Sequence, residues 1–519
     1  MRIPGLVLEF QTLPGAAPVA LARAGNAEWN EVAREVHASG GNLVALWGAD
    51  NRDVDGAFTV YAAYSLDDGL AVVVLPVTQT SPEGNPLYPE LSGMFPVAGR
   101  MQRALFDLLG VQAGGAPGQR PWLRHAAWPE GVYPLRRDFD AVQRYENAQE
   151  EYSFVRVEGD GVHEIPVGPI HAGIIEPGHF RFSIVGEKVL RLEERLGYTH
   201  KGIDKRFESF SVAEGYKLAG RVSGDSTVAY AWAYAQAAES LLGMAPPPRA
   251  VWLRALMLER ERVANHLGDL GAIGNDAALA FGLSQFMRLK EDWLRWAGAA
   301  FGHRFMMDCV VPGGVPRDLQ PGDAQRLLDL TQSIEREVHT LRGIYDEHAG
   351  LQDRFITAGR VTPRLAAQLG LTGLAARASG VPRDLRVDHP CAPYDELGVV
   401  LAEHRNGDVA ARVTVRFDEL FESLRLIRLI LQQMPSGELH LDLPEPRPGA
   451  FGVGWVEGWR GEVLVALEAG AGGMIRRGHA HDPSWQNWPV LEHAVMDNIV
   501  PDFPLINKSF NLSYSGHDL

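Results

Sequence analysis

The stretch from Gly168 to Ser226 most constrains how this chain can fold, because it places histidine, carboxylate and lysine side chains where an ordinary core would have aliphatic ones. Turn-forming Gly-Pro and Pro-Gly pairs flank its short apolar start, and Phe180–Val185 then alternates as a half-buried strand does. Val189–Leu196 is a second apolar–polar element. Loops held by such elements commonly present a functional site. We expect the last nine residues, 511–519, to pair with this stretch.

The histidines of this stretch admit two interpretations. Taken singly, His171, His179 and His200 are each explained as loop histidines bonded to backbone. As a cluster, with Glu176 and Lys201 close in sequence, they indicate a lined cavity or a subunit interface.

Composition limits the class of protein. A chain of 519 residues with 46% hydrophobic content predicts two or three domains with substantial cores. The net charge of -16 argues against nucleic acid as a partner, because a phosphate backbone requires a basic surface. No apolar run reaches the roughly 18 residues of a spanning helix, and the first residues lack the apolar core of a signal peptide. We therefore expect any membrane association to be through partners.

The chain has two cysteines, Cys309 and Cys391, which are far apart in sequence. They suit a reducing compartment and cannot by themselves hold an iron–sulfur cluster. We expect both to behave as small hydrophobic side chains.

Periodicity and turn signals predict an α+β fold, with a small α+β domain followed by a mainly helical part that contains a short β region. In the first domain we expect helices at 29–39 and 99–109 and strands at 43–47, 58–64 and 70–75. Beyond it we expect helices at 226–242, 250–270, 282–301, 324–349, 363–369, 409–434 and 487–498, and strands at 461–469 and 474–477. No phosphate-binding glycine loop or dinucleotide fingerprint is present.

One predicted helix carries Glu259, Arg262 and His266, which share a face because they are spaced by three and four. A structural ladder of ion pairs explains that face as well as a catalytic function does.

Several segments carry a resemblance to a known family. They are Gly-Pro-Ile-His at 168–171, Glu-Glu-Arg-Leu-Gly-Tyr-Thr-His-Lys-Gly-Ile-Asp-Lys at 193–205, Glu-Arg-Glu-Arg-Val-Ala-Asn-His-Leu at 259–267, Leu-Gly-Leu-Thr-Gly at 369–373 and Arg-Ala-Ser-Gly-Val at 377–381. From Ile165 onward the chain resembles the large subunit of group 4 membrane-bound nickel–iron hydrogenases. That family includes the large subunit of formate hydrogenlyase and is homologous to the 49-kDa-type (D) subunit of respiratory complex I.

The first domain carries a second resemblance. Its matching segments are Tyr-Pro-Glu-Leu-Ser-Gly-Met-Phe-Pro at 88–96, Leu-Phe-Asp-Leu-Leu-Gly at 105–110 and Tyr-Pro-Leu-Arg-Arg-Asp-Phe at 133–139. These resemble the 30-kDa-type (C) subunit of complex I. The resemblance therefore implies a fused C/D chain, with a C-like domain at 1–145 and a hydrogenase-large-subunit-like domain at 146–519.

The chain departs from the hydrogenases at their metal ligands. The family holds nickel and iron with Arg-x-Cys-Gly-x-Cys and, near the C-terminus, Asp-Pro-Cys-x-x-Cys. Here the first motif is Arg-Val-Ser-Gly-Asp-Ser at 221–226 and the second is Asn-Leu-Ser-Tyr-Ser-Gly at 511–516. Because hydroxyls are far poorer nickel ligands than soft thiolates, a nickel–iron centre is not expected, and we expect no directly bound cofactor and no metal.

The quinone-reducing relatives offer another template, with a histidine in the first loop and a tyrosine in the first ligand motif. Matching the loops places these at Ile175 and Gly224, so both proton donors are missing, although His171, His179 and Tyr514 are candidates to line the same cavity. Quinone binding remains an alternative that the resemblance suggests.

Two classes of function therefore stay open. The chain is either a component of a complex I-like, ion-translocating oxidoreductase or a non-catalytic subunit that couples conformational changes; a quinone-reducing NADH dehydrogenase-type subunit is a further alternative. The resemblance implies an iron–sulfur small subunit and membrane-embedded, proton-channel-like subunits as partners. It also implies a peripheral location on the cytoplasmic side of the inner membrane.

The candidate site residues follow from the two motif regions. We expect His171, Glu176, His179, Arg221 and Asp225, together with His517, to converge in one cavity, with Asp225 held ionised beside Arg221 and Glu176 unpaired. The positions of the lost metal site and its surroundings are Tyr198, His200, Lys201, Ser223, Ser226, Ser513 and His517.

Overall fold

The computed structural model describes residues 3, 6, 8–149, 151–171 and 175–519. Its N-terminal part is built on a five-stranded sheet in the order β1-β2-β5-β4-β3. The strands are β1 (Gln11–Thr12), β2 (Val19–Arg23), β3 (Asn42–Asn51), β4 (Ala57–Leu66) and β5 (Gly69–Val77). β2 and β5 run parallel and the other pairs are antiparallel. The three long strands are buried on both faces, which is why they are apolar nearly throughout.

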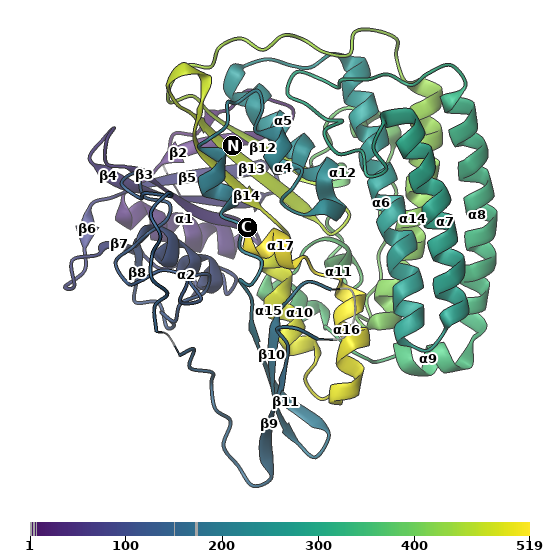
Figure 1. Cartoon of the computed structure of the whole chain (residues 1–519), viewed down its shortest axis with the longest axis horizontal. Helices are drawn as coiled ribbons and strands as arrows, with labels where there is room; N and C mark the ends of the chain where they lie inside the picture. Colours follow the sequence, from purple (N-terminus) through teal and green to yellow (C-terminus); the bar gives the residue numbers. More distant parts are fainter. Residues whose placement is uncertain (1–2, 4–5, 7, 150, 172–174) are drawn as a thin grey trace.

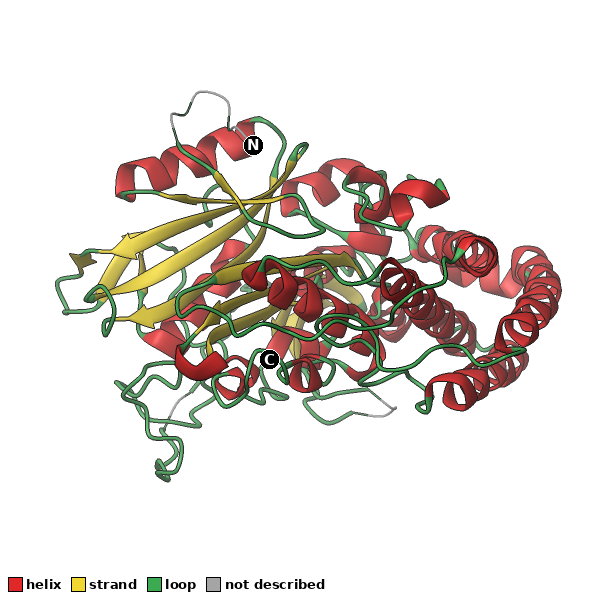
Figure 2. Ribbon diagram, turned by 90° about the horizontal axis from the view of Figure 1, so that it is seen from above, coloured by secondary structure: helices red, strands yellow, loops and turns green. Residues whose placement is uncertain are grey.

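Two helices and a small sheet cover one face of this sheet. They are α1 (Asn26–Ala38), α2 (Ala98–Leu109), β6 (Gln79–Thr80), β7 (Pro86–Pro89) and β8 (Gln112–Gly114). The other face packs on the sheet formed by β12 (Phe451–Glu457), β13 (Glu462–Ala469) and β14 (Ile475–His481). There Trp47 stacks on Tyr61 and His479 at centroid distances of 5.1 and 5.0 Å. The N-terminal and C-terminal sheets therefore share a core, and Figure 2 shows them as neighbouring layers.

A third sheet projects from the body in Figure 1, in the order β11-β10-β9. Its antiparallel strands are β9 (Val162–Val167), β10 (His179–Val185) and β11 (Lys188–Arg195). Phe180 and Phe182 on β10 pack against Phe503, so one face belongs to the core. The other face carries Arg181 and Arg195. Part of the apolar run predicted after Gly168, residues 172–174, lies outside the described residues.

Long helices form much of the remaining molecule. They are α5 (Thr227–Leu242), α6 (Pro248–Asp276), α7 (Ala280–Phe301), α8 (Asp323–Glu347) and α14 (Val409–Gln433). Figure 1 shows α6, α7, α8 and α14 at the right and α5 nearer the centre, beside β12. α6 is buried almost all round, since α7, α14 and α16 (Phe503–Phe510) pack against it. α5 lies directly on β12, where a Cβ at Gly454 would fall 1.9 Å from the carbonyl oxygen of Ala233. Only glycine allows this close approach of helix and strand.

Short helices connect these parts. They are α3 (Ile203–Phe207), α4 (Tyr216–Ala219), η1 (Gly224–Ser226), α9 (Ala349–Phe355), α10 (Pro363–Leu369), α11 (Gly373–Arg377), α12 (Leu385–Asp388), α13 (Tyr394–Leu397), η2 (Ala471–Gly473), α15 (Ser484–Ala494), η3 (Val500–Asp502), α16 (Phe503–Phe510) and α17 (Tyr514–Asp518). Among the described helices, none combines the length and the apolar composition that a membrane crossing requires.

The predicted α+β class, with a sheet domain before a helical part, is confirmed. Several predicted boundaries differ, and α6 extends six residues beyond 270. The prediction omitted β12, whose two glycines are unfavourable inside a strand, and it omitted the polar strand β9. Both strands form because neighbouring strands pair with them, which local pattern does not report.

Candidate functional site

The two segments that correspond to the metal-ligand motifs, residues 221–226 and 511–516, are called the motif loops, and they meet at a pair of serines. Ser223 precedes η1 and Ser513 precedes α17, and their Oγ atoms lie 2.9 Å apart although 290 residues separate them. Both serines are 3% exposed. Ser513 Oγ also accepts a hydrogen bond of 2.8 Å from the backbone N–H of Gly516, which caps α17. The two serine positions of the lost ligand motifs are thus joined by a direct hydrogen bond.

An ion pair between Asp225 and Arg460 lies beside the Ser223–Ser513 hydrogen bond. Arg460, in the turn between β12 and β13, donates from Nη1 and Nη2 to the two carboxylate oxygens at 2.8 and 2.6 Å. Its Nη1 also lies 3.3 Å from Ser226 Oγ, and its Nε donates to the carbonyl of Asn511 at 2.6 Å. Burial alone would raise the pKa of Asp225, but Arg460 and the hydroxyl of Ser223 lower it to about 2.

The fourth ligand position of the relatives corresponds to Gly516, and the carboxylate of Asp482 occupies the space where a side chain at this position would lie. A Cβ at Gly516 would lie 2.3 Å from Oδ2 of Asp482 and 2.8 Å from Ser513 Oγ. Asp482 is held there by the hydroxyl of Tyr230 at 2.7 Å and by the N–H of Ser484 at 2.8 Å. Any side chain at position 516 therefore requires Asp482 to move.

This donor set does not fit a nickel–iron centre. Three of the four positions offer hydroxyls that are bonded to one another or lie against the Asp225–Arg460 pair, and the fourth has no side chain. A nickel–iron centre calls for thiolates that point into a shared space. Among the described residues, no group of three or more His, Cys, Asp and Glu side chains has a metal-binding arrangement.

Arg221 is not the partner of Asp225, so that prediction is wrong. Its guanidinium points outward, 46% exposed, and binds Asp308 at 2.7 and 2.8 Å. The loop turns between Arg221 and η1, and the two side chains leave it in different directions. Arg460 takes the predicted position, from a segment that is distant in sequence.

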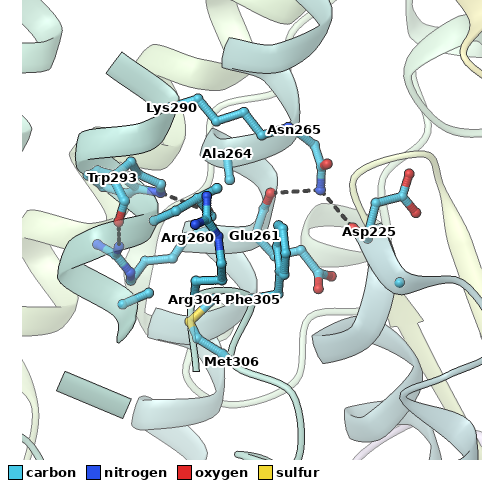
Figure 3. Close-up of a pocket in the computed structure, with 13 residues that line it drawn as sticks. Asp225, Arg260, Glu261, Ala264, Asn265, Lys290, Trp293, Arg304, Phe305 and Met306 are labelled. Carbon is cyan, nitrogen blue, oxygen red and sulfur yellow. Dashed lines mark hydrogen bonds between the residues drawn. The ribbon is translucent and has the colours of Figure 1, made fainter. Parts of the chain in front are cut away.

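A small pocket beside Asp225 lies between α6 and α7 (Figure 3). Asn265 reaches from α6 and donates to the backbone carbonyl of Asp225 at 2.7 Å. Glu261 accepts two N–H bonds at the start of α5, and burial raises its pKa to about 8. With a volume of about 20 Å³ the pocket has room for about one water molecule.

A much larger cavity, which we call the bundle cavity, has a volume of about 760 Å³. It is lined by Val167, His171, Ile175, Phe180, Ala272, Asn275, Asp276, Leu283, Met287, Lys290, Phe503, Pro504, Asn507, Lys508, Asn511, Leu512 and Tyr514. Lys290 on α7 also lines the small pocket, so its side chain lies in the wall between the two. Burial lowers the pKa of Lys290, and Asp269 and Asp225 oppose that shift.

His171 and Glu176 lie near this cavity, but only His171 lines it. The Nε2 atom of His171 is buried without a hydrogen-bond partner among the described residues. Glu176 is exposed and accepts the N–H of Ser515 at 2.9 Å, so the prediction of an unpaired, desolvated carboxyl is wrong.

His179 and Tyr198 belong to another place, on the polar face of the β9–β11 sheet. They line a separate cavity of about 290 Å³, which we call the sheet cavity. Its lining is His125, Ala126, Tyr152, Phe154, His179, Arg181, Arg195 and Tyr198. The predicted convergence of His179 with Asp225 is therefore wrong, because His179 opens β10 on the side opposite Phe180 and the core.

The remaining predicted residues bond to the C-terminal residues or to the first motif loop. His200 Nδ1 lies 2.7 Å from the carbonyl of Asp518, and Lys201 Nζ donates to the carbonyl of Val222 at 2.6 Å. His517 is fully buried, bonds Asp518 at 2.8 Å and stacks on Trp485 at 4.1 Å. It lines none of the three cavities described above.

The face of α6 that carries Glu259, Arg262 and His266 lies inside the bundle. Glu259 accepts bonds from Arg386, Tyr394 and Ser423, and His266 lies 2.9 Å from Glu419. These groups are nearly fully buried and mutually paired, which fits the structural interpretation.

The comparisons with known proteins agree with this architecture. Residues 23–145 match the family model described as the 30 Kd subunit of respiratory-chain NADH dehydrogenase, and residues 276–448 match the one described as its 49 Kd subunit. The class is thus a fused chain of 30-kDa and 49-kDa types. The chain belongs to the family of complex I-like and group 4 hydrogenase large subunits, in which its curated relatives are found.

Two of these relatives are from Escherichia coli. Formate hydrogenlyase subunit 5 is 32% identical over 490 residues, which is 93% of this chain and 85% of the relative. Hydrogenase-4 component G is 32% identical over 92% of this chain and 84% of its own length. The fused C/D subunit of the NADH-quinone oxidoreductase of Bacteroides thetaiotaomicron is 26% identical over 83% of this chain and 86% of its own length. All three names denote parts of multisubunit enzymes.

A solved structure shares the fold. A chain of the membrane-bound sulfane sulfur reductase, an archaeal respiratory membrane complex, superposes with a TM-score of 0.65 at 24% identity. The match covers 69% of this chain and 99% of that one.

Arg460, Asp482 and Lys290 were not predicted as site residues. Arg460 lies in a β-turn, Asp482 directly follows a strand, and Lys290 is one charged residue among several on an amphipathic helix. None has a local signal that separates it from surface residues of the same kind.

Proposed function

We propose that this chain is the large peripheral subunit of a complex I-like oxidoreductase related to the group 4 hydrogenases, working without a nickel–iron centre. It would lie on the cytoplasmic side of the inner membrane, beside an iron–sulfur subunit and membrane-embedded, proton-channel-like subunits. There it couples electron transfer from the partner's cluster to ion translocation. The family and the names of its relatives support this role.

The main support for the absence of a nickel–iron centre is the way the two motif loops pack against each other. The bond between Ser223 and Ser513, the ion pair of Asp225 with Arg460 and the crowding at Gly516 occupy the space in which relatives would hold metal. A network of this kind is satisfied without a ligand, so nothing in it calls for one.

The bundle cavity supports quinone reduction as a second candidate. Its volume of about 760 Å³ is in the range of small-molecule sites, and its lining combines apolar side chains with a few polar groups. His171, Tyr514 and Lys290 could donate hydrogen bonds to a quinone headgroup, while Leu283, Met287 and Phe503 would contact its apolar part. Two electrons from the partner's cluster and two protons would convert the quinone to the quinol.

Elemental analysis of the complex purified through a tag on this chain tests the main proposal. We expect iron from the partner subunit, less than a stoichiometric amount of nickel, and no hydrogen uptake. Stoichiometric nickel together with hydrogen uptake would overturn the proposal.

A quinone-reductase assay on the same complex tests the second candidate. Tyr514→Phe removes one hydroxyl from the bundle cavity, and Ala272→Phe fills part of its volume. Tyr145→Phe, at a hydroxyl outside the cavity, is the matched control. Loss of quinone reduction in both cavity variants, with the control active, supports the cavity as the acceptor site. If wild-type complex transfers no electrons to quinone, the conformational coupling role is favoured instead.

A further inference from the structure

Two lysines distinguish the bundle cavity from an ordinary apolar pocket. Lys290 on α7 and Lys508 on α16 both line it. Neither ammonium forms a hydrogen bond or a salt bridge with another residue in the described part of the chain. The two are near enough for Lys508 to lower the pKa of Lys290. Because lysines inside a protein are normally paired, this arrangement indicates a ligand that brings negative charge.

The carboxylates around Lys290 are bound to arginines. Asp225 accepts two bonds from Arg460, and Asp269 accepts a bond of 2.9 Å from Nε of Arg416. Both carboxylates oppose the lowering of the pKa of Lys290 by burial, but the pKa stays lowered. An anion bound beside the ammonium would oppose that shift further, as a close negative charge does.

Among the described residues that line the cavity, Asp276 is the only acid. It is exposed, and Lys508 lowers its pKa against the effect of burial. Water solvates an exposed carboxylate, so Asp276 offsets the charge of Lys508 only in part. Two lysines against one aspartate leave the described lining with a net positive charge.

The ammonium of Lys290 lies at the inner wall of the cavity, against α6. A Cβ at Gly268 would fall 2.6 Å from Nζ, so the glycine leaves the space that the ammonium occupies. Figure 3 shows the side chain reaching from α7 toward Asn265. Because Lys290 also lines the small pocket beside Asp225, a head group bound to it would lie on the side of the cavity that faces the first motif loop.

The lining becomes apolar away from this wall. Leu283, Met287 and Lys290 are spaced by four and three, so they share one face of α7. Met287 and Ile175 are each 41% exposed, which places the opening of the cavity beside them. Phe503 adds an aromatic ring from α16. A ligand that matches this order has an apolar body near the opening and a charged head inside.

Two neutral groups could donate to a second oxygen of such a head. Tyr514 Oη accepts the amide N–H of Asn507 at 3.4 Å, and its own O–H has no acceptor among the described residues. Burial raises the pKa of Tyr514, so the phenol keeps its proton. Neither ring nitrogen of His171 bonds to a described residue, so its tautomer is not fixed and Nε2 can carry a proton.

We propose that the bundle cavity binds an amphiphile with one negative charge on its head, and that Lys290 selects for that charge. The inference rests on the cavity of the second candidate function and specifies its ligand. Two kinds of molecule share this chemistry: a quinone with an ionised ring hydroxyl, and a carboxylate on an apolar chain. The head would lie at Lys290 and the body against Leu283, Met287 and Phe503.

Calorimetry on the purified complex, without an electron donor, tests the selection with two naphthoquinones of nearly equal size. One is 2-hydroxy-1,4-naphthoquinone, which is ionised at neutral pH, and the other is the neutral 2-methyl-1,4-naphthoquinone. We expect the ionised compound to bind about tenfold or more tightly than the neutral one, the effect of a hydrogen bond to a charged group.

Lys290→Met should bring the two affinities within about twofold of each other and leave that of the methyl compound nearly unchanged, which also shows that the cavity is intact. Lys290→Arg should keep the preference. Lys508→Met, at the second cation, should reduce the preference and gives the same test if Lys290→Met does not assemble. Lys188→Met is the matched control, since Lys188 pairs with Asp497 outside the cavity lining.

Octanoate and 1-octanol distinguish the two kinds of ligand. Octanoate that binds more tightly than octanol, and loses this advantage in Lys290→Met, assigns the site to anionic amphiphiles in general. Binding of the ionised naphthoquinone without binding of octanoate assigns it to an acidic quinone.

The inference is wrong if wild-type complex binds the two naphthoquinones equally, if the preference survives in Lys290→Met, or if none of the four probes binds. Reduction is measured separately, with an electron donor added. A complex that shows the preference and reduces neither quinone keeps this inference and loses the second candidate function. A complex that reduces both quinones and binds them equally does the reverse.

Discussion

Replacing Arg460 by Met should release the junction of the two motif loops. The Arg460 side chain is 6% exposed and forms a two-pronged ion pair with Asp225, together with a bond from Nε to the carbonyl of Asn511. Removing one partner of a buried pair costs about 3–5 kcal/mol. Asp225 is 40% exposed, so water would solvate the remaining carboxylate and bring the cost to about 2 kcal/mol. The lost bond to Asn511 adds about 1 kcal/mol, for a total of about 3 kcal/mol.

Hydrogen exchange measured by mass spectrometry on the purified complex is the suitable assay, because a chain of this size does not unfold in two states. A loss of about 3 kcal/mol in local stability corresponds to roughly a hundredfold faster exchange in peptides that cover 223–226 and 511–519. Arg221→Met is the matched control, since the exposed pair of Arg221 with Asp308 contributes about 1 kcal/mol or less.

A double-mutant cycle identifies the partner of Asp225. Asp225→Asn combined with Arg460→Met should show a coupling energy of about 1–2 kcal/mol, and combined with Arg221→Met a coupling near zero. Equal protection in wild type and Arg460→Met, or coupling to Arg221 instead, would refute the assignment.

Three further predictions concern the same region. Gly516→Cys should destabilise the C-terminal helix by about 2 kcal/mol or more because its Cβ meets Asp482. Gly343→Cys is the control, since this glycine of α8 has open space around it and no positive φ. Equal thermal midpoints for the two variants would contradict the crowding. The pKa of Asp225 is lowered to about 2, so its contribution to stability is present above about pH 4 and is lost as pH falls toward 2. The difference in local exchange between wild type and Asp225→Asn should shrink over that window, and a constant difference would rule the linkage out. Restoring cysteine at Ser223, Ser226, Ser513 and Gly516 together should not yield a nickel-containing protein by elemental analysis, since Asp482 and the ion pair remain in place; nickel in that variant would show that the ligands alone suffice.

The sequence by itself predicted those features that depend on residues near one another in the chain. Local sequence predicted α5, α7 and α14 with boundaries within about two residues. The content of alanine and aromatic residues indicated the buried helix α5, and local pattern indicated the other two, because the residues that form a helix are themselves near in sequence. The strand β10 was predicted by alternation, and Gly110 marked the end of α2 with a φ of +71°. The motif segments identified the fused C/D architecture for the same reason, since each is a short contiguous string.

Tertiary structure alone decided what surrounds the two serines. The meeting of Ser223 with Ser513 followed from the relatives, but the choice of Arg460 over Arg221 as the partner of Asp225 did not, because it depends on where a turn between β12 and β13 lies after the sheet packs on α5. The separation of His179 from this junction is likewise a property of the fold: two successive residues of a strand point to opposite faces, and only the packed sheet shows which face is the core. Local propensity acts through neighbours in the chain, whereas the charge partner of a side chain is set by contacts between distant segments.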